Sequence, residues 1–173
     1  KGVSRKRCLE ILLEIGKIKA SQEQFNRWLI EKNEDYLSLI EKMDESEILP
    51  DVQKVLQFLR KYHIPMALGS ASKNARPILE KVNLTDYFKV IVDGTQVTKA
   101  KPDPEVFLLA AEQMGVQPKE CVVFEDAVAG IEAANNAGML SIGIGEKKVL
   151  SEAKFVFANF TEIDDKFLKR LIG

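Results

Sequence analysis

Apolar positions in the first 43 residues follow a helical period. Residues 6–18 predict one helix, whose apolar positions are Leu9, Leu12, Leu13 and Ile15. The stretch Ser21-Gln-Glu-Gln24 resembles a capping box and opens a second predicted helix, which extends to about Met43. Everything before residue 44 is therefore expected to be helical.

From residue 51 onward, short apolar runs alternate with helical patterns. The predicted strands are residues 65–69, 90–92, 121–124, 140–144 and 155–157. The predicted helices are residues 51–62, 73–83, 104–114, 127–137 and 163–172. This alternation predicts an α/β fold, with a doubly wound, Rossmann-like parallel sheet and helices on its faces. Because the acidic stretch 44–47 reads as a linker, we expect a partial helical cap domain at 1–47 and an α/β core domain at 48–173.

The composition limits the class of protein. The chain has 173 residues, 46% of them hydrophobic and 29% charged, which is typical of one globular domain with a smaller appendage. Its net charge of −1 gives no bulk attraction to nucleic acid or to an anionic membrane. No apolar run has transmembrane length, the first twenty residues do not resemble a signal peptide, and Cys8 and Cys121 form no disulfide framework. We expect a cytoplasmic monomer that acts on a small molecule.

Two adjacent carboxylates, Glu125 and Asp126, follow the predicted strand 121–124. Paired acids at the carboxyl end of a buried parallel strand lie where open α/β sheets place their chemistry. Two hard oxygen ligands suit Mg²⁺, which prefers one or two carboxylates together with phosphate oxygens. The alternative is that Asp126 only caps the following helix and Glu125 is solvated, and this segment by itself favours neither reading.

Two further loops that follow predicted strands carry candidate phosphate ligands. The stretch Ser70-Ala-Ser-Lys-Asn74 places hydroxyls, an amide and an ammonium at the start of a predicted helix, where N–H groups and a positive dipole favour phosphate. Lys101 precedes a proline-bracketed turn and can neutralise a phosphoryl group as a point charge. Taken singly, Ser72 is better explained as a helix cap and Lys101 as a solvated turn residue.

The three loops together are more specific than any one of them. Carboxyl ends of parallel strands share one edge of the sheet, so the loops would bind a phosphate, neutralise it and hold its metal, which are the electrostatic parts of phosphoryl transfer. Histidine-based triads and histidine-rich zinc sites are poor fits, because His63 is the only histidine. The stretch Gly143-Ile-Gly145 lacks the third glycine and the helix of a dinucleotide fingerprint.

These loops resemble the motifs of the haloacid dehalogenase superfamily of phosphoryl-transfer enzymes, over residues 2 to about 145. Ser70 matches the family's second motif, Lys101 its third and Glu125-Asp126 its fourth. The resemblance implies that Ser70 and Lys101 stabilise the transferring phosphoryl group. It also implies that Asp126 holds Mg²⁺ with help from Glu125.

The cap and the first phosphate loop resemble the β-phosphoglucomutases within this superfamily. The resemblance implies that Arg5 holds the phosphate that is not being transferred. It also implies that Lys32 and Asn33 contact the sugar, although Lys32 and Asn33 could be ordinary helix-surface residues. The full set of implied substrate-binding residues is Gly2, Val3, Ser4, Arg5, Lys32, Asn33, Ser72, Lys73 and Asn74. The implied reaction interconverts β-glucose 1-phosphate and glucose 6-phosphate through a bisphosphate intermediate.

One motif of the family is missing from the sequence. This first motif is an Asp-x-Asp that supplies the nucleophile and the general acid and base, and Asp164-Asp165 has the wrong spacing to match it. We expect the motif and the first core strand to lie N-terminal to Lys1, which would leave unpaired edges in the sheet. Two alternatives stay open, a phosphatase of the same superfamily acting on a sugar phosphate or another small phosphomonoester, and a non-catalytic phosphate-binding fragment.

Overall fold

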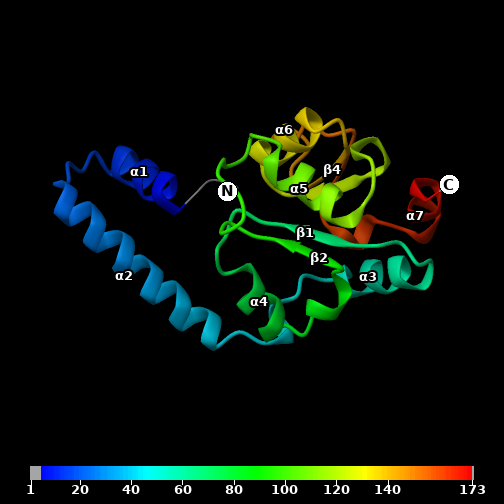
Figure 1. The fold of residues 1–173 in the computed structure, drawn as a ribbon, viewed down its shortest axis with the longest axis horizontal. Helices are drawn as coiled ribbons and strands as arrows, with labels where there is room; N and C mark the ends of the chain where they lie inside the picture. The colour runs from blue at the N-terminus through cyan, green and yellow to red at the C-terminus, as the bar shows by residue number, and fades with distance from the viewer. Residues whose placement is uncertain (1–4, 173) are drawn as a thin grey trace.

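The molecule has two parts, a pair of helices and a larger α/β body (Figure 1). The structure is a computed structural model and describes residues 5–172. Helix α1 (Arg5–Gly16) and helix α2 (Gln22–Glu41) form the first part. The hydroxyl of Ser21 accepts the backbone N–H of Gln24, and the Gln24 side chain accepts the backbone N–H of Ser21. The predicted capping box is therefore confirmed, and α2 runs unbroken from it.

The body alternates helices with short strands, as the sequence predicts. Its helices are α3 (Val52–Lys61), α4 (Ala75–Lys81), α5 (Glu105–Met114), α6 (Val128–Asn136) and α7 (Asp165–Leu171). Its strands are β1 (Ala67–Gly69), β2 (Val90–Val92), β3 (Val122–Glu125), β4 (Leu140–Ile144) and β5 (Phe155–Phe157). Short 3-10 helices are η1 (Glu45–Glu47), η2 (Thr85–Tyr87), η3 (Pro118–Glu120) and η4 (Phe160–Glu162). The ends of the ten predicted elements differ from the observed ones by at most two residues, and β3 extends to include Glu125.

The strands pair in parallel, which confirms the predicted α/β class. Strand β1 pairs with β2, with Gly69 opposite Val92. Strands β3, β4 and β5 form a second parallel set, in which Glu125 lies opposite Gly143. Over residues 5–172, β1 and β3 each have one hydrogen-bonded neighbour, so each presents an edge that is not paired.

Helices cover both faces of the strands. Figure 1 shows α5 and α6 on one side of β1 and β2 and α3 and α4 on the other. One apolar cluster packs α5 and α6 against β2 and β3, a second packs α3 and α7 against β4 and β5, and a third packs α3 and α4 against β2. The largest apolar side chains that are fully buried are Ile131, Ile142, Ile163, Leu168 and Val92. These contacts hold the carboxyl ends of β1 and β3 in fixed positions.

The helix pair joins the body at the C-terminal end of α4. The Lys81 ammonium donates to the carbonyl of Glu41 at 3.1 Å. The side-chain amide of Asn83 donates to the carboxylate of Glu45 in η1 at 2.6 Å. Within the described part of the chain, no helix is long and apolar enough to cross a lipid bilayer.

Candidate active site

Lys101 lies at the centre of the site and is buried. Its side chain is 6% exposed, and its ammonium is 2.6 Å from Oε2 of Glu125 and 3.3 Å from the carbonyl oxygen of Gly69. The ammonium also lies over the ring of Phe107, 4.5 Å from the ring centre, which is a favourable cation–π distance. Lys101 is therefore not the solvated turn residue that its loop alone suggests.

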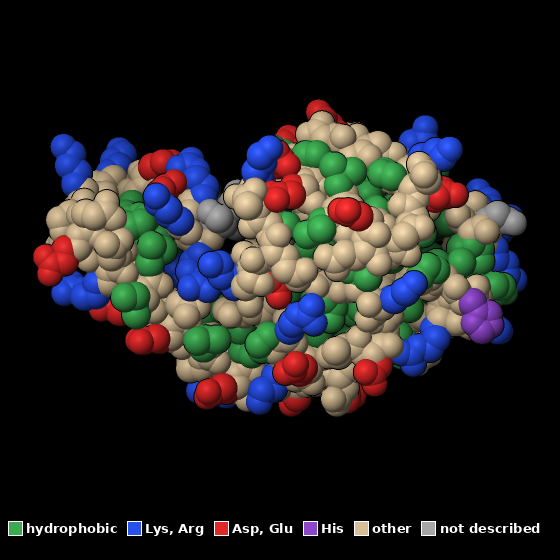
Figure 2. All heavy atoms as spheres, in the orientation of Figure 1, with side chains coloured by type: hydrophobic (Ala, Val, Ile, Leu, Met, Phe, Trp, Pro, Cys, Tyr) green, Lys and Arg blue, Asp and Glu red, His purple; other side chains and the backbone are tan. Residues whose placement is uncertain are grey.

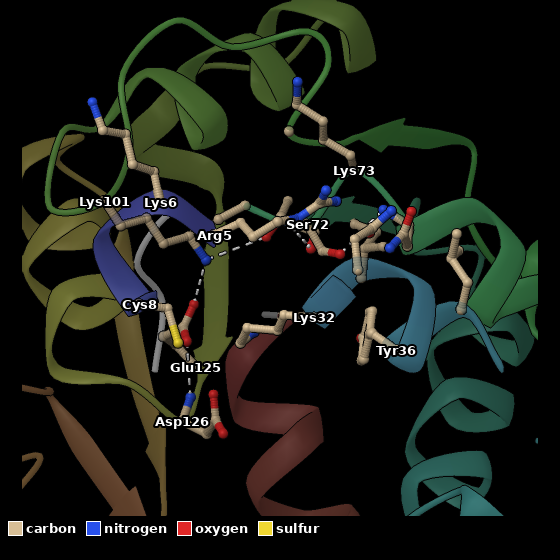
Figure 3. A pocket seen from close by; sticks show the side chains of 18 of the residues that line it. Arg5, Lys6, Cys8, Lys32, Tyr36, Ser72, Lys73, Lys101, Glu125 and Asp126 are labelled. Atoms are coloured by element: carbon tan, nitrogen blue, oxygen red, sulfur yellow. Dashed lines mark hydrogen bonds and ion pairs between the residues drawn. The ribbon is translucent and has the colours of Figure 1, made fainter. Parts of the chain in front are cut away.

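Glu125 is the partner that fixes this ammonium (Figure 3). Its side chain is 10% exposed. While Oε2 binds Lys101, Oε1 accepts the backbone N–H groups of Asp126 and Ala127, each at 3.1 Å. These N–H groups lie at the start of α6, where the helix dipole also favours a negative charge. The interpretation of Glu125 as a solvated residue is therefore wrong, and Asp126 does not cap α6, whose N-cap is Ala127.

The loop after β1 is closed by its own hydroxyl groups. Oγ of Ser70 accepts the backbone N–H of Ser72, and Oγ of Ser72 accepts the backbone N–H of Asn74, both at 3.1 Å. The N-cap of α4 is Asn74, so Ser72 closes a turn before the helix and is not its cap. These two N–H groups are consequently not available to a phosphate in this arrangement, which limits the predicted role of the helix start.

The sequence analysis missed a buried carboxylate that directly precedes a glycine in contact with this loop. Asp93, which follows β2, is 4% exposed and accepts the backbone N–H of Thr95 at 2.8 Å and its hydroxyl at 2.5 Å. Nε of Arg76 lies 3.6 Å from Asp93. Burial by itself raises the pKa of Asp93, but the hydrogen bonds from Thr95 and the charge of Arg76 outweigh it, so the pKa is lowered overall.

Gly94, the residue after Asp93, contacts the Ser70–Asn74 loop. The backbone N–H of Gly94 donates to the carbonyl of Ser72 at 3.2 Å. A Cβ at Gly94 would overlap the carbonyl oxygen of Ala71, so this close approach requires glycine. The sequence signal for these two residues is the Asp-Gly pair directly after the apolar run Val90-Ile-Val92. This run is another predicted strand that is followed by a polar residue.

A second missed residue, Glu105, anchors the loop that carries Lys101. Its carboxylate accepts the backbone N–H of Lys99 at 2.6 Å and both the backbone N–H and the hydroxyl of Thr98, at 3.0 to 3.2 Å. The N–H groups of Lys99 and Thr98 lower the pKa of Glu105. Glu105 is the first residue of α5, so its hydrogen bonds attach the Lys101 loop to the helix that packs on β1 and β2.

Helices α1 and α2, which the sequence predicts to be part of a cap, form the opposite wall of a large cavity of about 1180 Å³. Figure 2 shows basic side chains where the helix pair meets the body. Eight of the predicted substrate-binding and catalytic residues line this cavity together with the two predicted metal ligands: Arg5, Lys32, Asn33, Ser70, Ser72, Lys73, Asn74, Lys101, Glu125 and Asp126. The predicted residues Gly2, Val3 and Ser4 lie outside the described residues.

The cap residues are held less firmly than those of the body. Arg5 is exposed in the first turn of α1, and Lys32 lies on α2. Oδ1 of Asn33 is buried without a hydrogen-bond partner in the described part of the chain. A buried polar atom of this kind is costly unless something binds it, which is compatible with a role in ligand contact.

Glu125 and Asp126 fit the oxygen donors that Mg²⁺ prefers, which are one or two carboxylates completed by water and phosphate oxygens. Over residues 5–172, no cluster of three or more acidic, histidine or cysteine side chains forms a complete metal site. Since Lys101 already neutralises Glu125, a divalent cation here would share that carboxylate with the ammonium.

Comparison with known proteins agrees with this geometry. The family model described as haloacid dehalogenase-like hydrolase matches residues 4–138. The chain is 36% identical over 165 residues to a β-phosphoglucomutase of Bacillus subtilis, covering 94% of this chain and 73% of the relative. It is also 36% identical over 159 residues to a phosphorylated carbohydrates phosphatase of Thermotoga maritima, covering 88% and 71%.

A solved structure gives the same family likeness. The crystal structure of a β-phosphoglucomutase from Clostridium difficile superposes with a TM-score of 0.90 at 35% identity, covering 98% of this chain and 77% of that chain. The mutase and the phosphatase relatives are similar to this chain at nearly equal identity, so identity by itself does not separate the two activities.

Proposed function

Because this chain belongs to the haloacid dehalogenase-like hydrolase family, we propose that it is the phosphoryl-binding and sugar-binding part of a β-phosphoglucomutase. The reaction would interconvert β-glucose 1-phosphate and glucose 6-phosphate. The observation that carries the proposal is that Ser70, Lys101 and Glu125 line the same cavity as Arg5 and Lys32 on the cap. A phosphatase needs only the three body residues, Ser70, Lys101 and Glu125. A mutase also needs residues such as those on the cap, because it has to hold a second phosphate at the other end of the sugar.

Ser70 and Lys101 would act on the phosphoryl group in transfer. The Lys101 ammonium is fixed before substrate arrives, by Glu125, Gly69 and Phe107, so it requires little reorganisation to stabilise developing negative charge. The Ser70 hydroxyl would donate to a phosphoryl oxygen. The nucleophile that the family uses belongs to an Asp-x-Asp motif, which these 173 residues do not contain.

Asp126 and Glu125 would hold the Mg²⁺ ion. The ion would neutralise phosphoryl oxygens and help to orient them for in-line transfer. The Glu125 carboxylate would interact with both this ion and the Lys101 ammonium, since it faces both positive charges.

The cap residues would hold the sugar and its second phosphate. The guanidinium of Arg5 suits a phosphate because it can donate two parallel hydrogen bonds, and Lys73 adds a second charge from the body side. Lys32 and Asn33 would contact the sugar hydroxyl groups. Closure of the cap would exclude water, so that a sugar hydroxyl accepts the phosphoryl group.

The direct test follows the products by ³¹P NMR. Purified protein that carries the family's Asp-x-Asp motif together with this chain is mixed with β-glucose 1-phosphate, a small amount of glucose 1,6-bisphosphate and Mg²⁺. Formation of glucose 6-phosphate without inorganic phosphate is the expected result. Inorganic phosphate that accumulates in step with substrate loss contradicts the mutase assignment, and binding of orthophosphate without turnover favours a non-catalytic module.

Arg5 provides a sharper test of the mutase assignment. Arg5→Ala is expected to lower kcat/KM for the mutase reaction about 10- to 100-fold, as expected for one lost charge-assisted contact of ~1.5–3 kcal/mol. Arg27→Ala is the matched control, because Arg27 lies on α2 and pairs with Glu31 at 3.5 Å. Equal mutase activity in both variants would remove Arg5 from the substrate site.

A sugar-phosphate phosphatase is the second candidate. It is favoured by the similarity to the Thermotoga maritima phosphatase, which acts on phosphorylated carbohydrates according to its name. The phosphatase would use Ser70, Lys101 and the acidic pair in the same way. It would differ in letting water reach the phosphoryl group, and in that case Arg5→Ala would change phosphate release little.

A further inference from the structure

Gly130 lies in the first turn of α6, where helix propensity gives no reason for a glycine. Glycine is the least favourable helix residue after proline, because it loses the most backbone freedom on folding. Its φ is not in the left-handed region, so the backbone conformation at this position does not require glycine either. The reason for glycine here has to come from a neighbour.

That neighbour is the Glu125 side chain. A Cβ at Gly130 would overlap three atoms of Glu125 at once, namely Cγ, the carboxyl carbon and Oε2. Oε2 is the oxygen that binds Lys101, and Oε1 is held by the backbone N–H groups of Asp126 and Ala127. Glu125 therefore cannot move away from a new methyl group without breaking these contacts.

We propose that Gly130 is a positioning residue of the reaction site, which acts by leaving the space in which the Glu125 carboxylate lies. It touches no substrate. It sets where Glu125 presents its charge, and through Glu125 it sets the position of the Lys101 ammonium. The contribution of this arrangement to catalysis rests on the proposed function, whereas the arrangement itself can be measured without turnover.

Gly130→Ala is expected to displace Glu125 and to weaken binding of Mg²⁺. Loss of the support behind a metal ligand typically lowers metal affinity about 10- to 100-fold, and an effect of at least about tenfold is expected here. The variant should also lower kcat more than it raises KM, because Lys101 acts mainly on the transition state. If Gly130 served only the helix, alanine would instead raise stability.

The experiment compares the metal affinity and the carboxylate signal of four variants. Titration with Mg²⁺ alone gives the dissociation constant, and ¹³C NMR of the Glu125 carboxyl and ¹⁵N NMR of the Lys101 ammonium report their pairing.

Val128→Ala is the control on the same turn of α6, since Val128 is 43% exposed and its substitution should leave both readouts unchanged. Glu125→Ala and the double variant Glu125→Ala/Gly130→Ala complete the cycle, because Glu125→Ala removes the three nearest atoms that the new methyl group would overlap.

The outcomes separate the inference from a simple folding effect. It is supported if Gly130→Ala shifts both NMR signals and weakens Mg²⁺ binding while adding nothing in the Glu125→Ala background. A Gly130→Ala chain that does not fold supports it too, provided that the double variant folds. Unchanged Glu125 and Lys101 signals in folded Gly130→Ala overturn it, as does equal misfolding of the single and double variants. A wild-type protein that carries the Asp-x-Asp motif, turns over no sugar phosphate and still shows these shifts would contradict the proposed function and leave the role of Gly130 intact.

Discussion

The two walls of the cavity differ in how firmly their charged groups are held. On the body wall, Lys101 and Glu125 are at most 10% exposed, and backbone N–H groups, a carbonyl and an aromatic ring surround them. On the cap wall, α1 and α2 have one buried side chain each, Leu9 and Ile40. Large apolar residues such as Ile15, which is 74% exposed, remain in contact with solvent there.

Under the proposed function, this contrast separates two tasks. Groups that stabilise a transition state act best when they are already in place, and the body supplies the packed scaffold for that. Groups that recognise the substrate can lie on elements that move, because closing around the ligand is part of their function. Substitutions on the body wall should therefore lower both stability and activity, whereas substitutions on the cap wall should change the free energy of unfolding little, even where they remove a substrate contact.

The largest effect is expected at Lys101. Lys101→Met should lower turnover about 10³-fold, by analogy with the loss of a preorganised oxyanion donor. It should also lower the free energy of unfolding by about 3 kcal/mol, because Glu125 would remain buried without its partner. Turnover and urea unfolding measure the two effects.

The double variant Lys101→Met/Glu125→Gln is the control for the stability effect. It removes both charges and should recover most of the lost stability, although not the activity. Unfolding of the double variant at the same urea concentration as Lys101→Met would mean that the ion pair is not the source of the loss.

An intermediate effect, on stability more than on chemistry, is expected at Asp93. Asp93→Asn should lower the free energy of unfolding by about 2 kcal/mol at neutral pH, since it weakens the bonds to Thr95 and the attraction to Arg76. The folded pKa of Asp93 is lowered, so its stabilisation is present above the unfolded value of about 3.9 and is lost as pH falls through the folded pKa. Urea unfolding at several pH values should show the difference between wild type and variant shrinking below about pH 5. A difference that does not depend on pH would contradict this role.

The smallest effect is expected on the cap, at Ser21. Ser21→Ala removes the capping box of α2 and should cost about 1 kcal/mol locally. Amide hydrogen exchange in the first turn of α2 should become faster, while turnover stays within about twofold of wild type because the site residues are unchanged. Ser38→Ala, which removes a single mid-helix hydrogen bond to Asp35, is the matched control. A loss of global stability as large as that of Asp93→Asn would show that the cap is coupled to the body more tightly than the contrast implies.

The sequence predicts the elements well because local patterns determine them. The capping box at Ser21 and the apolar runs that became β2, β4 and β5 needed no information from distant parts of the chain. The candidate residues after β1 and β3 could also be chosen, since the ends of parallel strands share an edge.

The contacts between loops could not be predicted in the same way. The bond from Lys101 to Glu125 spans 24 positions, and nothing in the spacing shows that Lys101 is buried beside Phe107. Asp93 and Glu105 were missed because their partners are backbone N–H groups, which every sequence has. The glycine at 130 looks like an ordinary helix residue until the position of Glu125 is known.

Helix α4 connects the Ser70–Asn74 loop to the base of the cap. Its seven residues form a rod about 10 Å long, with the Ser70–Asn74 loop at one end and the ties from Lys81 and Asn83 to the cap linker at the other. A short, packed helix moves as a rigid unit, because its backbone contains no flexible hinge. We therefore expect a displacement of the Ser70–Asn74 loop along the axis of α4 to reach the two hydrogen bonds that Lys81 and Asn83 make at the base of the cap.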